Sequence, residues 1–161
     1  MYPSQRPLYY REVMISLYRR FTSLERSQRR LVVEAAALMA IVWVGLRMHR
    51  FLTLRRTLDR FVVLTSTRAS LADRNVVDSV RQAIAAVAVR FSSATCLVQA
   101  LAADAMLRRR HLASELRLGV RLRDREDAAA IPIEAHAWVE CDGAVVIGAI
   151  AQQSEFKVLT R

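Results

Sequence analysis

The spacing of apolar residues changes once along this chain, and the change constrains the fold more than any other feature of the sequence. As far as His111, apolar residues recur every three or four positions, which is typical of amphipathic helices. From Leu116 to Leu122, and again from Ala135 to Cys141, every second residue is apolar, as in half-buried strands. Helices followed by an antiparallel meander predict an α+β fold.

The expected elements divide into an N-terminal helical region, residues 1–70, and a second unit, residues 71–161. The boundary falls in a polar stretch that starts at residues 65–67. Asp142-Gly143 is a hairpin signal that precedes a return strand at 144–147. Helices are expected at residues 8–21, from the capping box 22–25 through 46, and at 48–63, 76–91 and 96–111, with a short last strand at 156–159.

The longest apolar run, Leu31 to Leu46, is interrupted only by Glu34. Sixteen helical residues cover roughly 24 Å at about 1.5 Å each, which is short of the roughly 30 Å hydrocarbon core of a bilayer. This length favours a buried or partner-covered helix over a membrane span. Arginines at both ends of the run, Arg29-Arg30 and Arg47, keep membrane contact through Leu31–Leu46 open.

The formal net charge of +10 comes almost wholly from arginine, since Lys157 is the only lysine. No aromatic residues interleave with the arginine clusters, so we expect a solvated basic surface and no nucleic acid partner. The polar first residues lack the apolar core of a signal peptide, and two cysteines fit a reduced, cytoplasmic protein. The usual zinc, nucleotide and flavin motifs are absent from the sequence, so neither a cofactor nor a metal is expected.

Cys96 and His136 form the pair of residues with the clearest chemical meaning. Cys96 follows a small-residue turn and starts a helix, whose dipole favours the nucleophilic thiolate. His136 lies on a strand, from which it could take the thiol proton and later protonate a leaving amine. Either residue alone would more often be structural, but the order helix, strand, hairpin favours catalysis. Cys141 shares the apolar face of its strand and is expected to be a packing residue.

These residues resemble a known family. The segments that carry the likeness are Cys96-Leu-Val-Gln-Ala-Leu, Leu118-Gly119-Val120, and Ala135-His136-Ala137-Trp138-Val139-Glu140 followed by Asp142-Gly143. They are similar to those of the lasso-peptide leader peptidases, which are transglutaminase-like (papain-like) cysteine proteases of microcin-processing type. The resemblance implies a core of one helix and an antiparallel sheet, and removal of the leader from a ribosomally made precursor peptide. It also implies a separate leader-binding protein and a macrolactam synthetase as partners.

The third catalytic position departs from the family pattern. The family's acid tends to follow the return strand in a Gly-Asp or Gly-Glu pair, whereas here Gly148 is followed by Ala149. We assign the role to Asp142, while Glu155 or a Cys/His dyad without an acid stay open. The alternative function is a catalytically impaired scaffold of the same fold, which would dock on a partner synthetase or a membrane.

Overall fold

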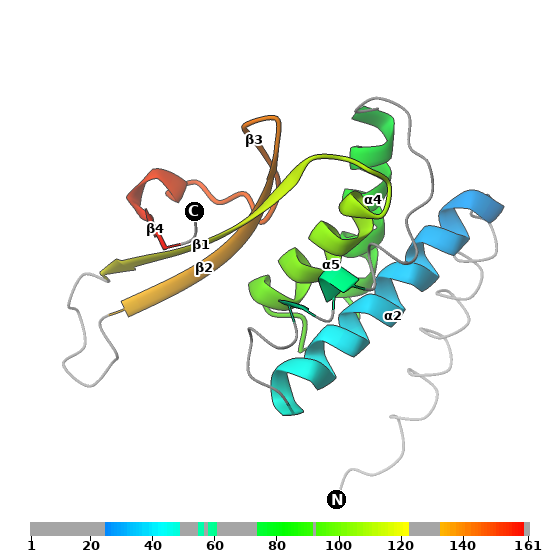
Figure 1. The fold of residues 1–161 in the computed structure, drawn as a ribbon, viewed down its shortest axis with the longest axis horizontal. Coiled ribbons are helices and arrows are strands. Elements are labelled where there is room, and N and C mark those ends of the chain that lie inside the picture. The colour runs from blue at the N-terminus through cyan, green and yellow to red at the C-terminus, as the bar shows by residue number, and fades with distance from the viewer. Residues whose placement is uncertain are drawn as a thin grey trace, which may run out of the picture.

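Helices precede strands in the structure, as the change of apolar spacing predicts. The structure, a computed structural model, describes residues 25–48, 55–56, 58–60, 74–91, 93–122 and 133–159. Within these residues, three long helices lie on one side of a four-stranded antiparallel sheet, which confirms the α+β fold (Figure 1). The helix expected at 8–21, most of the one at 48–63 and the polar stretch after it lie outside the described residues. The helices are α2 (Arg26–Met48), α4 (Arg74–Ala88) and α5 (Cys96–Arg108).

Helix α5 is the centre of the core, because it packs against α2, α4 and the sheet. Its sequence suits this position: from Ala100 to Leu107 every side chain is buried, and half of these residues are alanines. Small side chains let neighbouring helices approach closely, while Met106 and Leu107 fill the remaining volume. The single charged residue of this stretch, Asp104, accepts a hydrogen bond from the Ser114 hydroxyl at 2.7 Å.

The sheet has the strand order β3-β2-β1-β4. Strands β1 (Ser114–Leu122) and β2 (Ile133–Cys141) pair along their whole length and place Gly119 opposite His136. Asp142 and Gly143 make the turn to β3 (Ala144–Ile147), and both have the positive φ values, 49° and 74°, of a two-residue hairpin turn. The chain then passes through a short 3-10 helix, η1 (Gln153–Glu155), and returns as β4 (Lys157–Val158) on the far edge of β1.

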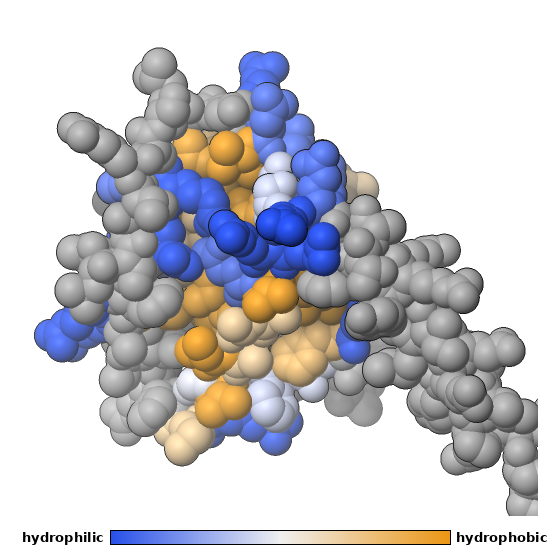
Figure 2. All heavy atoms as spheres, turned by 90° about the vertical axis from the view of Figure 1, so that its right-hand side faces the viewer, coloured by the Kyte–Doolittle hydropathy of each residue, from blue (hydrophilic) through white to orange (hydrophobic). Residues whose placement is uncertain are grey.

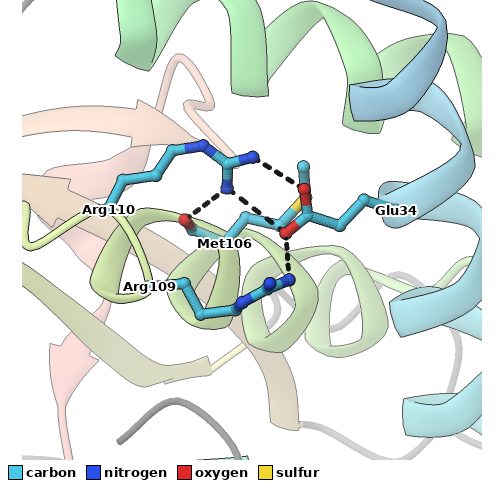
Figure 3. Close-up of polar contacts among 4 residues, drawn as sticks. All are labelled: Glu34, Met106, Arg109 and Arg110. Carbon is cyan, nitrogen blue, oxygen red and sulfur yellow. Dashed lines mark hydrogen bonds and ion pairs between the residues drawn. The ribbon is translucent and has the colours of Figure 1, made fainter. Parts of the chain in front are cut away.

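An ion-pair cluster ties α2 to the end of α5 (Figure 3). The Glu34 carboxylate accepts hydrogen bonds from Arg109 at 2.5 Å and from Arg110 at 2.6 Å, and Arg110 also donates to the Met106 carbonyl. All three charged side chains are at least three-quarters buried. The one acid inside the apolar run is therefore neutralised within the protein, at the interface of α2 with α5.

The face of α2 that points away from α5 exposes apolar side chains. They follow a helical spacing, and the large ones are Val33, Ile41, Val44 and Met48. Figure 2, which views this side of the molecule, shows hydrophobic surface next to a band of hydrophilic residues. By length and composition alone, α2 is the one helix among the described residues that could cross a membrane, a test that core helices of soluble proteins also pass.

Candidate active site

Cys96 is the first residue of α5, as the sequence predicts. Thr95 caps the helix with extended backbone angles, φ −61° and ψ 162°, and its hydroxyl accepts a hydrogen bond from the Val98 N–H at 3.4 Å. The Gln99 side chain donates to the Ala94 carbonyl at 2.7 Å and fastens the chain that leads into the cap. The half-buried Cys96 thiol thus lies at the N-terminus of the central helix, the positive end of the helix dipole.

His136 lies on β2 with its ring nitrogen Nε2 2.7 Å from the Gly148 carbonyl oxygen. A carbonyl oxygen can only accept, so Nε2 carries the proton of the neutral ring and Nδ1 keeps its lone pair. Gly148 turns the chain at φ 77°, and a Cβ there would lie 2.8 Å from the Ala137 carbonyl oxygen. Only glycine can place this carbonyl against the imidazole.

Two aromatic rings enclose the imidazole. The Trp138 ring stacks on it at 6.0 Å between centroids and 17° between planes, and the Phe156 ring lies 5.7 Å away. Gly119 leaves room for both, since a Cβ there would lie 2.8–2.9 Å from atoms of Trp138 and Phe156. The indole N–H of Trp138 donates to Glu140 at 2.8 Å. The ring of His136 is therefore held on two sides by packing and at Nε2 by a hydrogen bond.

The structure does not bring Asp142 to His136. Asp142 is in the hairpin turn, six residues further along an extended strand, which corresponds to roughly 20 Å. It lines a cavity of about 410 Å³ together with Cys141 and residues of α4. Glu155, the other acid considered, pairs with Arg121 at 2.7 Å. The family pattern indicates an acid directly after Gly148, and in this structure the Gly148 carbonyl itself contacts the imidazole.

Cys96 and His136 lie on different sides of β2. Ala137 and Val139 belong to the core that packs on α5, and Cys96 packs against the same core. His136 and Trp138 alternate with them and project from the other face, toward Phe156. In the described part of the chain the thiol makes no hydrogen bond with the imidazole. Strand β3 pairs only with residues 139–141 of β2, so the edge of the strand beside His136 is bordered by Gly148.

Cys141 differs from Cys96 in its surroundings. Burial raises the pKa of the Cys141 thiol, and the neighbouring Asp142 carboxylate raises it further. Both effects favour the neutral thiol over the nucleophilic thiolate. Cys141 also packs against the hydrophobic core, so its setting is that of a packing residue. Among the described residues, no group of three or more histidine, cysteine or acidic side chains is placed to hold a metal ion.

Sequence reasoning missed the two groups that organise His136. The Gly148 carbonyl belongs to the backbone, although a glycine directly after the return strand marks its position. Arg121 is one of the polar residues that alternate with apolar ones along β1, and this alternation does not indicate its partners. In the structure it bonds to Glu134, Glu155 and Gln152 and lies over Phe156, which contacts the imidazole.

A comparison with known protein families matches residues 40–161 to the transglutaminase-like superfamily. The match covers most of the chain, and the protein therefore belongs to this superfamily, which includes cysteine peptidases and acyltransferases. It begins inside α2, thirty residues before the domain boundary predicted at residue 70, and that boundary stays a prediction. Searches against curated proteins and against solved structures found no match.

Proposed function

We propose that this member of the transglutaminase-like superfamily is a cysteine peptidase with Cys96 as nucleophile and His136 as general base. The observation that carries the proposal is the state of the imidazole. Its Nε2–H is engaged by the Gly148 carbonyl at 2.7 Å, so that the basic Nδ1 is left for the thiol proton. Cys96 at the N-terminus of the central helix supplies the matching nucleophile.

The reaction would run in two halves. The thiol proton passes to Nδ1 of His136 as the Cys96 sulfur bonds to the scissile carbonyl carbon, and the backbone N–H of Cys96 helps to hold the oxyanion. The C–N bond then breaks, and His136 protonates the leaving amine. In the second half, His136 deprotonates a water molecule that hydrolyses the thioester and frees the thiol. Each proton that His136 takes up in one half of the cycle is released again in that half, and the cycle uses no cofactor.

The thiol and the imidazole must approach each other for this chemistry. Catalytic hydrogen bonds are often long in free enzymes and tighten when the substrate binds. The approach would occur around the edge of β2 beside His136, because β3 ends before that point.

The resemblance of the Cys96 and His136 segments to leader peptidases supports a specific substrate. We infer that the chain removes the leader of a lasso-peptide precursor, together with a separate leader-binding protein and ahead of a macrolactam synthetase. Cytoplasmic location follows from this proposal, because these partners act on a newly made peptide.

A second function is favoured by two observations. The Cys96 thiol and the His136 imidazole make no hydrogen bond with each other in the described part of the chain, and α2 exposes apolar side chains along its outer face. Both suit a scaffold without activity that docks through α2 on the synthetase or on a membrane. Thiol reactivity separates the two functions, since only a peptidase requires Cys96 to be more reactive than Cys141.

The test is leader removal from a lasso-peptide precursor, followed by mass spectrometry with a leader-binding protein present. Cys96→Ser and His136→Ala should each lower the rate by more than a hundredfold, while Cys141→Ser, a matched thiol control, should retain it. Cleavage by Cys96→Ser at the parental rate would refute the peptidase mechanism. Absence of cleavage by the parent protein, with Cys96 no more reactive than Cys141, would favour the scaffold.

A further inference from the structure

Arg121 makes hydrogen bonds to three side chains on the face of the sheet that carries His136. Its Nε donates to Glu134 at 3.0 Å, and its Nη1 donates to Gln152 and to Glu155, both at 2.7 Å. Glu134 belongs to β2, whereas Gln152 and Glu155 belong to the segment that follows β3. One guanidinium on β1 therefore joins the neighbouring strand to the C-terminal segment.

The same guanidinium places an aromatic ring against the imidazole. It lies over the Phe156 ring at 4.9 Å from the centroid, within the range of a cation–π interaction. Phe156 is buried and contacts the His136 ring at 5.7 Å. Arg121 thus fixes the C-terminal segment in the position in which Phe156 covers one side of His136.

Arg121 also pairs with two acids whose neighbours in the chain include His136 or its packing partner Phe156. Glu134 is two residues before His136 on the same strand and face, and Glu155 directly precedes Phe156. Among the described strand residues, the remaining charged groups on this face are Glu115, Arg117 and Glu140. Arg117 pairs with Glu115 at 2.5 Å and with Glu140 at 3.1 Å. An unpaired carboxylate near an imidazole would favour the imidazolium and would compete with the Gly148 carbonyl for the ring N–H.

We propose that Arg121 is a positioning residue for His136. Its guanidinium binds the Glu134 and Glu155 carboxylates, so that they do not bond to the imidazole, and it holds Phe156 against the ring. The ring N–H is then oriented by its hydrogen bond to the neutral Gly148 carbonyl. The role rests on the proposed function, in which His136 needs a free Nδ1 to accept the thiol proton. It also explains how a histidine without an orienting acid keeps a single tautomer.

The test follows the His136 ring by long-range proton–nitrogen NMR correlation of the full chain labelled with ¹⁵N-histidine. The chain has three histidines, so His136→Gln assigns the resonances. The parent should show the Nε2–H tautomer. Arg121→Met keeps most of the apolar stem of the side chain but removes the charge that lies over Phe156. It should give mixed tautomers and move ring protonation upward by at least about half a pH unit.

Two further variants make the result specific. Arg121→Met with Glu155→Gln should return the ring toward its parental behaviour, because one of the released carboxylates is gone. Arg81→Met removes another arginine that pairs with an acid, Asp78, at a surface position, and should leave the ring unchanged. If Arg121→Met fails to fold by circular dichroism, Arg121→Lys replaces it. Lysine keeps the charge without the planar fork, so ring protonation should stay parental while the tautomers mix.

An Arg121 variant that folds and leaves both tautomer and ring protonation at parental values would overturn the proposal. Because the readout needs no substrate, it is independent of whether the chain cleaves a leader. Where cleavage is observed, Arg121→Met should lower kcat about tenfold or more with little change in KM.

Discussion

Asp142→Asn and Ala149→Asp together decide which group orients His136. Asp142 is roughly 20 Å from the imidazole along β2. At that distance two unit charges interact by only about 0.2 kcal/mol in water, before screening over a Debye length of about 8 Å. Asparagine tolerates the positive φ of this turn position. We therefore expect Asp142→Asn to change the rate of leader cleavage by less than about twofold.

Ala149→Asp has the opposite expectation. Residue 149 follows the glycine whose carbonyl is 2.7 Å from Nε2, and its own side chain is exposed. A carboxylate there would stabilise the imidazolium that forms during attack, by an amount on the order of 1–2 kcal/mol at a partly solvated site. That corresponds to roughly a five- to thirtyfold faster reaction if the acylation step limits the rate. The gain stays far below the effect of a lost triad acid, because the tautomer is already correct.

The assay is the single-turnover rate of leader cleavage with the leader-binding protein present, measured for both variants between pH 5 and pH 9. A hundredfold loss in Asp142→Asn would show that Asp142 reaches His136 in the working enzyme and that the distance along β2 misleads. That result would refute an imidazole oriented by the backbone. A loss of activity in Ala149→Asp would mean that the new carboxylate competes with the Gly148 carbonyl for the ring N–H, and it would refute the predicted gain in rate.

Three further predictions concern stability and reactivity. Glu34→Ala leaves two largely buried arginines without their acid and should lower the free energy of unfolding by about 2–3 kcal/mol. Arg81→Ala, at an exposed pair, should lower it by under about 0.5 kcal/mol. Equal losses in urea titrations would contradict the anchoring of α2. Burial raises the pKa of Asp104, so its contribution to stability is present in acid and is lost as the pH rises through the folded-state pKa. Asp104→Asn should therefore gain stability relative to the parent as the pH rises above the ordinary carboxyl pKa of 3.8, and a difference that does not vary with pH would argue against this. Iodoacetamide at pH 7.5 should label Cys96 before Cys141, because the raised pKa of Cys141 shifts its reaction to more alkaline pH. If peptide mapping shows the reverse order, Cys96 is not the nucleophile.

The fold was predictable to the extent that it follows from local spacing. Alternation of apolar residues located β1 and β2 within two residues, and Asp142-Gly143 placed the hairpin turn, because both signals depend on neighbours in the sequence. The last strand was predicted less accurately. The apolar pattern predicts a strand at 156–159, whereas β4 begins at Lys157 and the preceding Phe156 packs its side chain on His136.

The candidate site was predictable only in its side chains with distinctive chemistry. Cys96 and His136 stand out by residue type and by element, whereas their partners depend on tertiary structure. Glu34 and Arg110 are 76 residues apart, and Arg121 meets Glu155 across 34 residues. Such pairs leave no local pattern, because any arginine of this basic chain could have served. The expected acid was missed for a different reason, since the group that took its place is a backbone carbonyl.

Residues 148 and 149 differ in how well they tolerate substitution, because the Gly148 carbonyl must stay against His136 whereas the Ala149 side chain is exposed. Gly148 needs its positive φ and has no space for a Cβ against the Ala137 carbonyl, so replacing it would disturb β2 and His136 together. The Ala149 side chain is exposed, so a side chain there can change without repacking. A carboxylate at residue 149 orients by charge, whereas the Gly148 carbonyl orients by backbone geometry. A chain with alanine at residue 149 can therefore keep an oriented His136, provided that Gly148 and the packing around the ring are kept.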